Sequence, residues 1–242
     1  MSIRFLLIFT IVFSTINTKA QQNFFNVPSS DITKKSDLFF QEQLNLTTEA
    51  TQSSTTFCYG LGKNLEIGFN LIGMNLNYQR GIDFEDDNQP YAPYLSLNLQ
   101  KAFPLSEKLK FSIGGQSGFN RSSKFGYYVY SNLGLNLHEL HAKIILGTYL
   151  SNSNYFGPGN ANLFSANSIA VPIQFGIEKS IIKDKLLFQA DFISGKHAMG
   201  EAVIGFAYFM NKNWILSSGY QIPNDQSMSN KALVFELTYL PN

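Results

Sequence analysis

Apolar and polar residues alternate along most of this chain, and the clearest stretch runs from Gly126 to Leu150. The apolar residues occupy mainly odd positions from Tyr127 to Leu137 and even positions from Leu140 to Leu150. A period of two places successive side chains on opposite faces of a strand. The stretch therefore predicts a β-hairpin with one apolar and one polar face. Its arms match the roughly 9–11 residues that a tilted strand needs to cross a bilayer.

The same alternation recurs through the rest of the chain and predicts an all-β fold, a closed antiparallel transmembrane β-barrel of about 12 strands. Closure leaves no unpaired strand edge. Short turns are expected on the periplasmic side and longer polar loops on the extracellular side. The short turns are predicted near residues 62–64, 104–108, 138–140, 182–185 and 211–213, and the two longest loops at 77–90 and 151–166.

Two irregularities are expected within the strands. The apolar phase slips by one residue between Leu71 and Met74, which indicates a β-bulge beside Gly73. Pro172 falls inside a predicted strand from Ile169 to Glu178. Because proline lacks a backbone N–H, a second bulge is expected there.

The chain divides into three parts. Residues 1–20 contain a basic Arg4, an apolar run and small residues at Thr18 and Ala20, the pattern of a cleaved secretory signal peptide. Residues 21–36 form a polar N-terminal lead, and residues 37–242 form the barrel. We therefore expect export across the inner membrane and localisation in the outer membrane.

Composition supports a barrel in lipid. Charged residues make up 14% of the chain, against roughly 25% in soluble domains. Loss of Arg4 and Lys19 with the leader changes the net charge from +1 to −1, so no basic surface for nucleic acid is expected. The single cysteine, Cys58, excludes an intramolecular disulfide.

These features resemble the outer-membrane β-barrel proteins of Gram-negative bacteria, including porin-like members, from Leu38 to Leu240. The signal peptide, the alternating strands and the terminal strand ALVFELTYL carry the resemblance. The chain departs from the usual aromatic C-terminus, since Leu240-Pro241-Asn242 follow Tyr239. The resemblance implies outer-membrane lipid and the barrel-assembly machinery as partners.

The inward phase of the strands supplies the candidate functional residues. Its many glycines, asparagines and serines leave room for a narrow aqueous pore, whereas its charges could instead pair across the lumen and plug it. Three tyrosines could form a stacking surface for a solute. The candidate lumen-lining residues are Glu66, Asn98, Lys110, Tyr128, Tyr130, Asn132, Lys143, Tyr149, Glu178, Asp191 and Glu236.

No catalytic, cofactor-binding or metal-binding residue is predicted. His138-Glu139-Leu140-His141 is one residue shorter than the zinc motif H-E-x-x-H, and no G-x-S-x-G motif occurs. The chain is therefore expected to be a non-enzymatic, passive pore or binding channel for a small polar solute. Two alternatives stay open: a structural or adhesive barrel acting through its extracellular loops, and an outer-membrane hydrolase assembled from distant residues.

Overall fold

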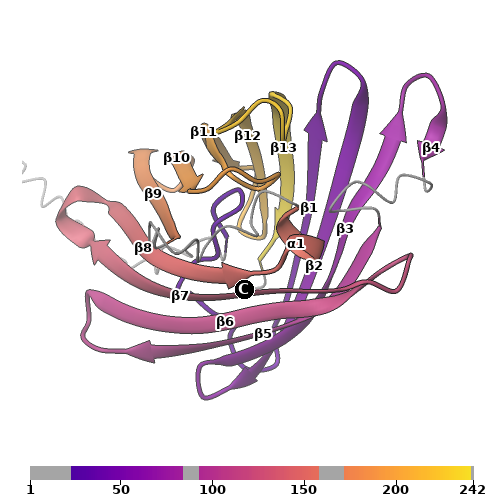
Figure 1. Ribbon diagram of the computed structural model, residues 1–242. Coiled ribbons are helices and arrows are strands. Elements are labelled where there is room, and N and C mark those ends of the chain that lie inside the picture. Colours follow the sequence, from indigo (N-terminus) through magenta and orange to yellow (C-terminus); the bar gives the residue numbers. More distant parts are fainter. Residues whose placement is uncertain (1–22, 84–92, 158–171, 241–242) are drawn as a thin grey trace, which may run out of the picture.

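A computed structural model of the protein shows a closed antiparallel β-barrel of twelve strands with one short additional strand (Figure 1). It describes residues 23–83, 93–157 and 172–240, so the expected signal peptide lies outside the described residues. The strands are β1 (Leu38–Leu46), β2 (Ala50–Gly62), β3 (Leu65–Asn77), β4 (Gly81–Asp83), β5 (Tyr94–Pro104), β6 (Leu109–Asn120), β7 (Phe125–Leu137), β8 (Ala142–Ser151), β9 (Ile173–Ile182), β10 (Leu186–Ile193), β11 (Glu201–Phe209), β12 (Trp214–Pro223) and β13 (Ala232–Tyr239).

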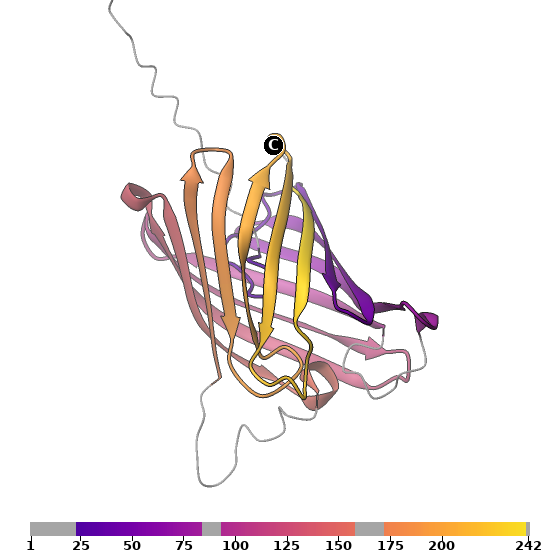
Figure 2. The ribbon, with the colours of Figure 1, turned by 90° about the horizontal axis from the view of Figure 1, so that it is seen from above.

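The first and last strands close the barrel. β1 pairs with β13 from Phe40–Tyr239 to Leu46–Leu233, and every other wall strand pairs with its neighbours in the chain. Both ends of the wall lie on the side of the short turns, because the start of β1 lies opposite Tyr59 and the end of β13 opposite Trp214. Figure 2 shows the C-terminal end beside these turns. The expected closed barrel is confirmed.

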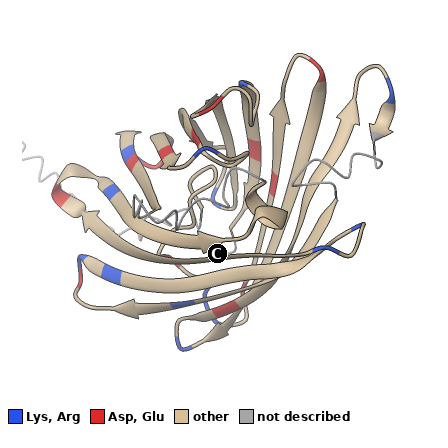
Figure 3. Ribbon diagram, in the orientation of Figure 1, with Lys and Arg blue, Asp and Glu red and all other residues tan. Residues whose placement is uncertain are grey.

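The alternation of residue types explains which side chains face out. On β5 the outward Leu95, Leu97 and Leu99 are 51 to 68% exposed, while Ser96 and Gln100 between and beside them are buried. Similar apolar rows cover most of the other strands, although on β1 and β2 the outward Glu42 accepts hydrogen bonds from the hydroxyls of Ser53 and Thr55. Charged residues are sparse along the ribbon, with several at the turns (Figure 3). Such a surface is unfavourable in water and compatible with hydrocarbon.

The bulge predicted beside Gly73 is confirmed. Ser53 pairs with Met74 and Ser54 with Ile72, so Gly73 has no partner in the ladder between β2 and β3. Its φ of 74° lies in the left-handed region that glycine adopts without a steric penalty. The slip of one residue keeps the apolar side chains on the outer face on both sides of the bulge.

The expectation of a bulge at Pro172 is wrong. β9 begins at Ile173, so Pro172 precedes the strand and its missing N–H removes no ladder hydrogen bond. In the β9–β10 hairpin the register shift lies at the other end, between Leu186 and Leu187.

Both long loops contain structure that the sequence did not predict. β4 pairs with the end of β3 inside the predicted 77–90 loop. The helix α1 (Ser153–Phe156) and the end of β8 lie within the predicted 151–166 loop. A one-turn 3-10 helix, η1 (His138–Leu140), forms the turn of the central hairpin. In the part of the chain that the structure describes, no helix has the length and apolar character needed to cross a membrane.

Candidate functional site

The interior of the barrel contains the stretch of chain that precedes β1. We call residues Asn23 to Asp37 the N-terminal segment; it appears in indigo inside the ring of strands in Figure 1. Its tip is a tight turn in which Phe24 N–H donates to the Val27 carbonyl over 3.1 Å. Phe24, Val27 and Ser29 are fully buried. The sequence described this stretch as a polar lead and did not predict its place in the lumen.

The segment enters the lumen from the side of the short turns. Ser36 N–H donates to the Gly60 carbonyl over 2.8 Å, and Gly60 N–H donates to the Asp37 carbonyl over 3.1 Å. One step further in, the Glu66 carboxylate accepts hydrogen bonds from Thr33 N–H (2.8 Å) and the Thr33 hydroxyl (3.0 Å). The predicted lumen residue Glu66 therefore binds the segment near the short-turn end.

Two lysines of the wall bind Asp31. Lys110 of β6 and Lys143 of β8 place their ammonium groups 2.5 and 2.7 Å from the two carboxylate oxygens of Asp31. Lys143 also donates to the Ser29 hydroxyl. Burial opposes ionisation of Asp31, but the two lysine charges outweigh it and lower the pKa of the carboxyl from 3.8 to about 2.

Two wall carboxylates bind the tip of the segment, towards the long-loop end. Asp191 of β10 accepts hydrogen bonds from Asn26 N–H (2.5 Å) and Val27 N–H (2.8 Å). Glu201 of β11 accepts one from the Asn26 side-chain amide (2.8 Å). The two Asp191 contacts satisfy backbone donors that would otherwise have no partner in the lumen.

Side-chain amides of the wall bind the backbone carbonyls of the segment between its tip and Asp31. Asn132 donates to the Pro28 carbonyl and Gln100 to the Ser29 carbonyl, both over 2.7 Å. The segment thus meets polar wall side chains from β1, β3, β5, β6, β7, β8, β10 and β11. An extended peptide without a partner strand has its hydrogen bonds supplied by side chains instead.

Inward glycines make the space for the segment. A Cβ added at Gly134 would lie 1.9 Å from Ser30 Oγ, and one at Gly176 would lie 2.9 Å from the Phe24 ring. At Gly219 the nearest atom would be in the Phe25 ring, also at 2.9 Å. The sequence indicated that these glycines leave room in the lumen, and the N-terminal segment fills much of that room.

Beside the segment lies a cavity of about 140 Å³, between the segment and the wall of β1, β2, β3, β5 and β6. Carboxamides are the commonest side chains in its lining. Glu66 is the one charged residue of the lining among those the structure describes, and its carboxylate binds Thr33. The carboxamides are Asn23, Asn26, Gln41, Gln43, Asn45, Gln52, Asn70, Asn98, Gln100 and Gln116.

Several of these carboxamides bind one another. Asn98 donates to Asn70 over 2.8 Å, and Asn70 donates to Gln116. Gln43 donates to Asn45 over 3.0 Å. A carboxamide offers both donors and an acceptor, so this wall can bind hydroxyl or amide groups of either polarity without a net charge.

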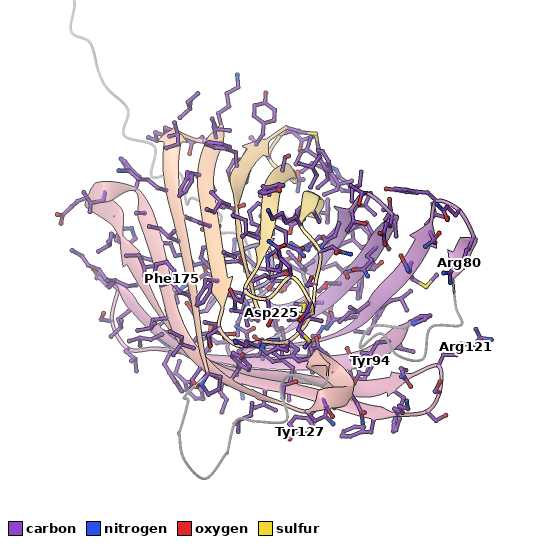
Figure 4. All side chains as sticks on the ribbon, turned by 45° about the horizontal axis from the view of Figure 1, so that its top comes forward. Arg80, Tyr94, Arg121, Tyr127, Phe175 and Asp225 are labelled. Atoms are coloured by element: carbon purple, nitrogen blue, oxygen red, sulfur yellow. The ribbon has the colours of Figure 1, made fainter. Side chains whose placement is uncertain are left out.

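Two of the three predicted stacking tyrosines, Tyr128 and Tyr149, are covered, and the third, Tyr130, lines the cavity. Tyr155 of α1 stacks on Tyr128 at 5.7 Å between ring centroids, and Phe156 lies 5.3 Å from Tyr149. Tyr130 contacts Tyr128 at 5.2 Å and donates to Gln100 over 2.6 Å. Figure 4 shows Tyr94, which contacts Tyr155, near α1. Together with His197, these rings form a cluster towards the long-loop end, which we call the aromatic cap, and they bury Tyr128 and Tyr149.

The two remaining predicted residues lie in networks within the wall. Glu178 accepts a hydrogen bond from Gln189 over 2.8 Å. Glu236 accepts hydrogen bonds from the hydroxyls of Ser217 (3.3 Å) and Thr238 (3.1 Å). The predicted set therefore separates into residues that bind the N-terminal segment, residues that line the cavity, cap tyrosines and these two carboxylates.

The barrel is similar to solved porin structures. The NanC porin aligns with a TM-score of 0.55 and 10% sequence identity over 85% of this chain and 100% of that one. This chain has the fold of an outer-membrane porin. The KdgM porin aligns with a TM-score of 0.55 and 8% identity over 84% and 99% of the two chains. A second KdgM structure, in complex with disordered oligogalacturonate, aligns with a TM-score of 0.52. No protein-family model and no curated protein matches the chain.

This porin fold carries no hydrolytic triad at its described histidines. His197 Nε2 lies 2.7 Å from the Tyr149 hydroxyl and 3.0 Å from the Ser194 carbonyl, so its partners do not include a serine hydroxyl. His138 and His141 lie in the exposed turn around η1. Within the described ranges, no group of three His, Cys, Asp or Glu side chains could hold a metal ion.

Proposed function

We propose that the protein is an outer-membrane porin that binds and passes small, uncharged polar solutes along the carboxamide-lined side of its lumen. The observation that carries this proposal is the lining itself, ten carboxamides around a cavity of about 140 Å³. Neutral donors and acceptors bind hydroxyl-rich or amide-rich solutes. They offer no opposite charge that would attract an ion into the lumen.

The outer surface supports a location in the outer membrane. Outside a membrane, rows such as Leu95, Leu97 and Leu99 would expose large apolar areas to water. Exposure of apolar surface to water costs about 25 cal/mol of free energy per Å². Solved porins share the barrel, and the expected signal peptide provides export. Outer-membrane lipid and the barrel-assembly machinery remain the expected partners. We expect the protein to have no catalytic activity.

Liposome swelling tests this proposal. The mature chain is refolded in detergent, reconstituted, and exposed to neutral sugars and to anionic sugars of equal size. Neutral solutes below a size limit are expected to cause swelling, and anionic ones to cause less. Equal rates for both classes would contradict the neutral selectivity. An absence of swelling for every solute would contradict transport.

A single isosteric variant tests the role of the lining. Gln52 lines the cavity, and Gln52→Glu adds one negative charge at nearly constant volume. We expect it to slow anionic solutes further and to shift ion selectivity in planar bilayers towards cations. The matched control is Gln79→Glu, which adds the same charge in the exposed turn after β3.

A further inference from the structure

The N-terminal segment occupies the lumen without belonging to its wall. The wall closes through β1 with β13 and through β2 with β3, so its hydrogen-bond ladder is complete without the segment. The hydrogen bonds described above between residues 23–33 and the barrel all use side chains of the wall. Removal of the segment would therefore leave the ladder intact.

The polar contacts that hold the segment are ones that water could replace. Lys110 and Lys143 bind Asp31, Asp191 binds the Asn26 and Val27 amides, and Glu66 binds Thr33. These groups are charged, and a water-filled lumen would solvate them. Three apolar side chains of the segment also pack inside the barrel: Phe24 and Val27 lie in the cap cluster, and Phe25 packs against Val203 and Val234.

The attachment to the wall lies at one end. The segment joins β1 at Asp37, beside the Gly60 pairing on the short-turn side. Ser36 has a φ of 67°, so the chain changes direction where it enters the lumen. With the expected cleavage after Ala20, the other end carries no covalent connection. The segment can then withdraw through the short-turn end while β1 stays paired.

We propose that the N-terminal segment is a displaceable plug, bound in a peptide site that the lumen builds for it, and that its withdrawal opens the barrel to larger solutes. The seated segment leaves the cavity of about 140 Å³, and the withdrawn segment adds the volume now filled by Phe24 to Thr33. This proposal rests on the proposed function only for its permeation readout.

A disulfide across the segment and the wall tests the proposal. The Cβ of a residue 134 side chain would lie 2.9 Å from Ser30 Cβ, below the roughly 3.5–4.5 Å of a disulfide. The segment therefore has to move outward by about 0.6 Å at Ser30 to form the bond. The variant Ser30→Cys/Gly134→Cys is made in a Cys58→Ser background. We expect the oxidised form to pass only the smallest solutes, and the reduced form to show a several-fold higher open probability in planar bilayers.

A second disulfide controls for oxidation itself. Ser131 and Thr148 face each other on the outer side of β7 and β8, away from the segment. Ser131→Cys/Thr148→Cys in the same background is expected to conduct equally when oxidised and reduced. If the Ser30–Gly134 variant also conducts equally in both states, with the cross-link confirmed by mass, the segment is not a displaceable plug.

Deletion of residues 21–33 gives an independent test. The truncated barrel is expected to pass larger neutral sugars than the full chain, and a synthetic peptide of residues 21–36 is expected to restore the smaller limit. An unchanged limit in a folded truncated barrel would overturn the proposal. If the truncated chain does not fold, the disulfide pair still decides the question.

A readout without permeation separates this proposal from the proposed function. Cys58 is buried beside the cavity, so its labelling by a bulky maleimide in detergent reports access to the lumen. Labelling is expected to be at least ten-fold faster in the truncated chain. Faster labelling without any solute flux would refute transport and keep the plug, whereas equal labelling rates would refute the plug.

Discussion

Lys143 Nζ lies 2.7 Å from the Asp31 carboxylate and so joins strand β8 to a peptide inside the barrel. Asp31→Asn keeps the shape of this side chain and removes its charge. Because hydrogen bonds to charged groups contribute about 1.5–3 kcal/mol each, we expect the segment to leave its site more often by at least ten-fold. The measurement is maleimide labelling of a Ser30→Cys probe in a Cys58→Ser background.

The exposed carboxylate of Asp225 provides the control for this variant. It binds only the nearby Ser227 in the loop between β12 and β13 among the contacts described. Asp225→Asn should leave labelling of the Ser30→Cys probe unchanged. Equal labelling of the Asp31→Asn and Asp225→Asn variants would show that the Lys110 and Lys143 contacts do not hold the segment.

The same contact predicts a response to acid. The pKa of Asp31 is about 2 in the seated segment against an ordinary 3.8. The stabilisation is therefore complete above about pH 4 and is lost as pH falls from there towards 2, with a size of about 2 kcal/mol. Because the thiolate is the reactive form, labelling of the Ser30→Cys probe is divided by that of free cysteine at the same pH, and this ratio should rise across the window.

Other titratable groups face the segment, and a difference measurement removes them. Glu178 lies beside Lys143 in the wall, and Glu66, Asp191 and Glu201 bind the segment elsewhere. At each pH, the labelling of the Ser30→Cys probe is compared between the chain that keeps Asp31 and the Asp31→Asn variant. The difference between the two isolates the contribution of Asp31. A difference that stays constant from pH 5 to pH 2 would contradict the prediction.

His197 predicts a separate response in the aromatic cap. Burial against Phe156, at 4.6 Å between ring centroids, lowers the pKa of His197 from 6.5 to about 4. Its folded form is neutral where the unfolded chain is protonated, so stability is highest above about pH 6.5 and falls as pH drops towards 4. The loss is about 3 kcal/mol in the free energy of unfolding.

Thermal unfolding in detergent at pH 7.5 and pH 4.5 measures this effect. The His197→Gln variant stays neutral at both values, so its midpoint should change less with pH than that of the unmodified chain. Equal changes in the two proteins would mean that His197 does not titrate in this range on unfolding.

Phe24 predicts how much apolar packing adds to seating of the segment. Its ring is fully buried, contacts the position of Gly176 and lies 5.3 Å from Lys143 Nζ. Phe24→Ala should cost about 3–5 kcal/mol of seating and raise labelling of the Ser30→Cys probe, with the barrel still folded. The control Phe235→Ala removes an outward ring on β13 and should leave labelling unchanged.

Period-two alternation was sufficient to predict the wall. The strands, the short turns and the bulge at Gly73 depend on residues that lie near one another in the chain. It failed at Pro172, because the apolar alternation continues before the first paired residue of β9. Local pattern does not mark the point where pairing begins.

The alternation of apolar and polar residues could not predict what fills the lumen. Lys143 and Asp31 are 112 residues apart in sequence, and Glu201 and Asn26 are 175 apart. Only closure of the ring brings such pairs together. The sequence identified the inward charges and glycines. It did not indicate that they accommodate a peptide of the same chain. The sequence also did not predict that α1 packs on Tyr128 and Tyr149.

The seam between β1 and β13 has a consequence for biogenesis. The segment is synthesised before β1, whereas the seam forms only when the last strand, β13, pairs with the first. If the strands form in the order of the sequence, the N-terminal segment is therefore present before any strand of the wall has formed. The lumen can be assembled around that peptide, with Asp191 and Lys143 meeting their partners before the ring is sealed.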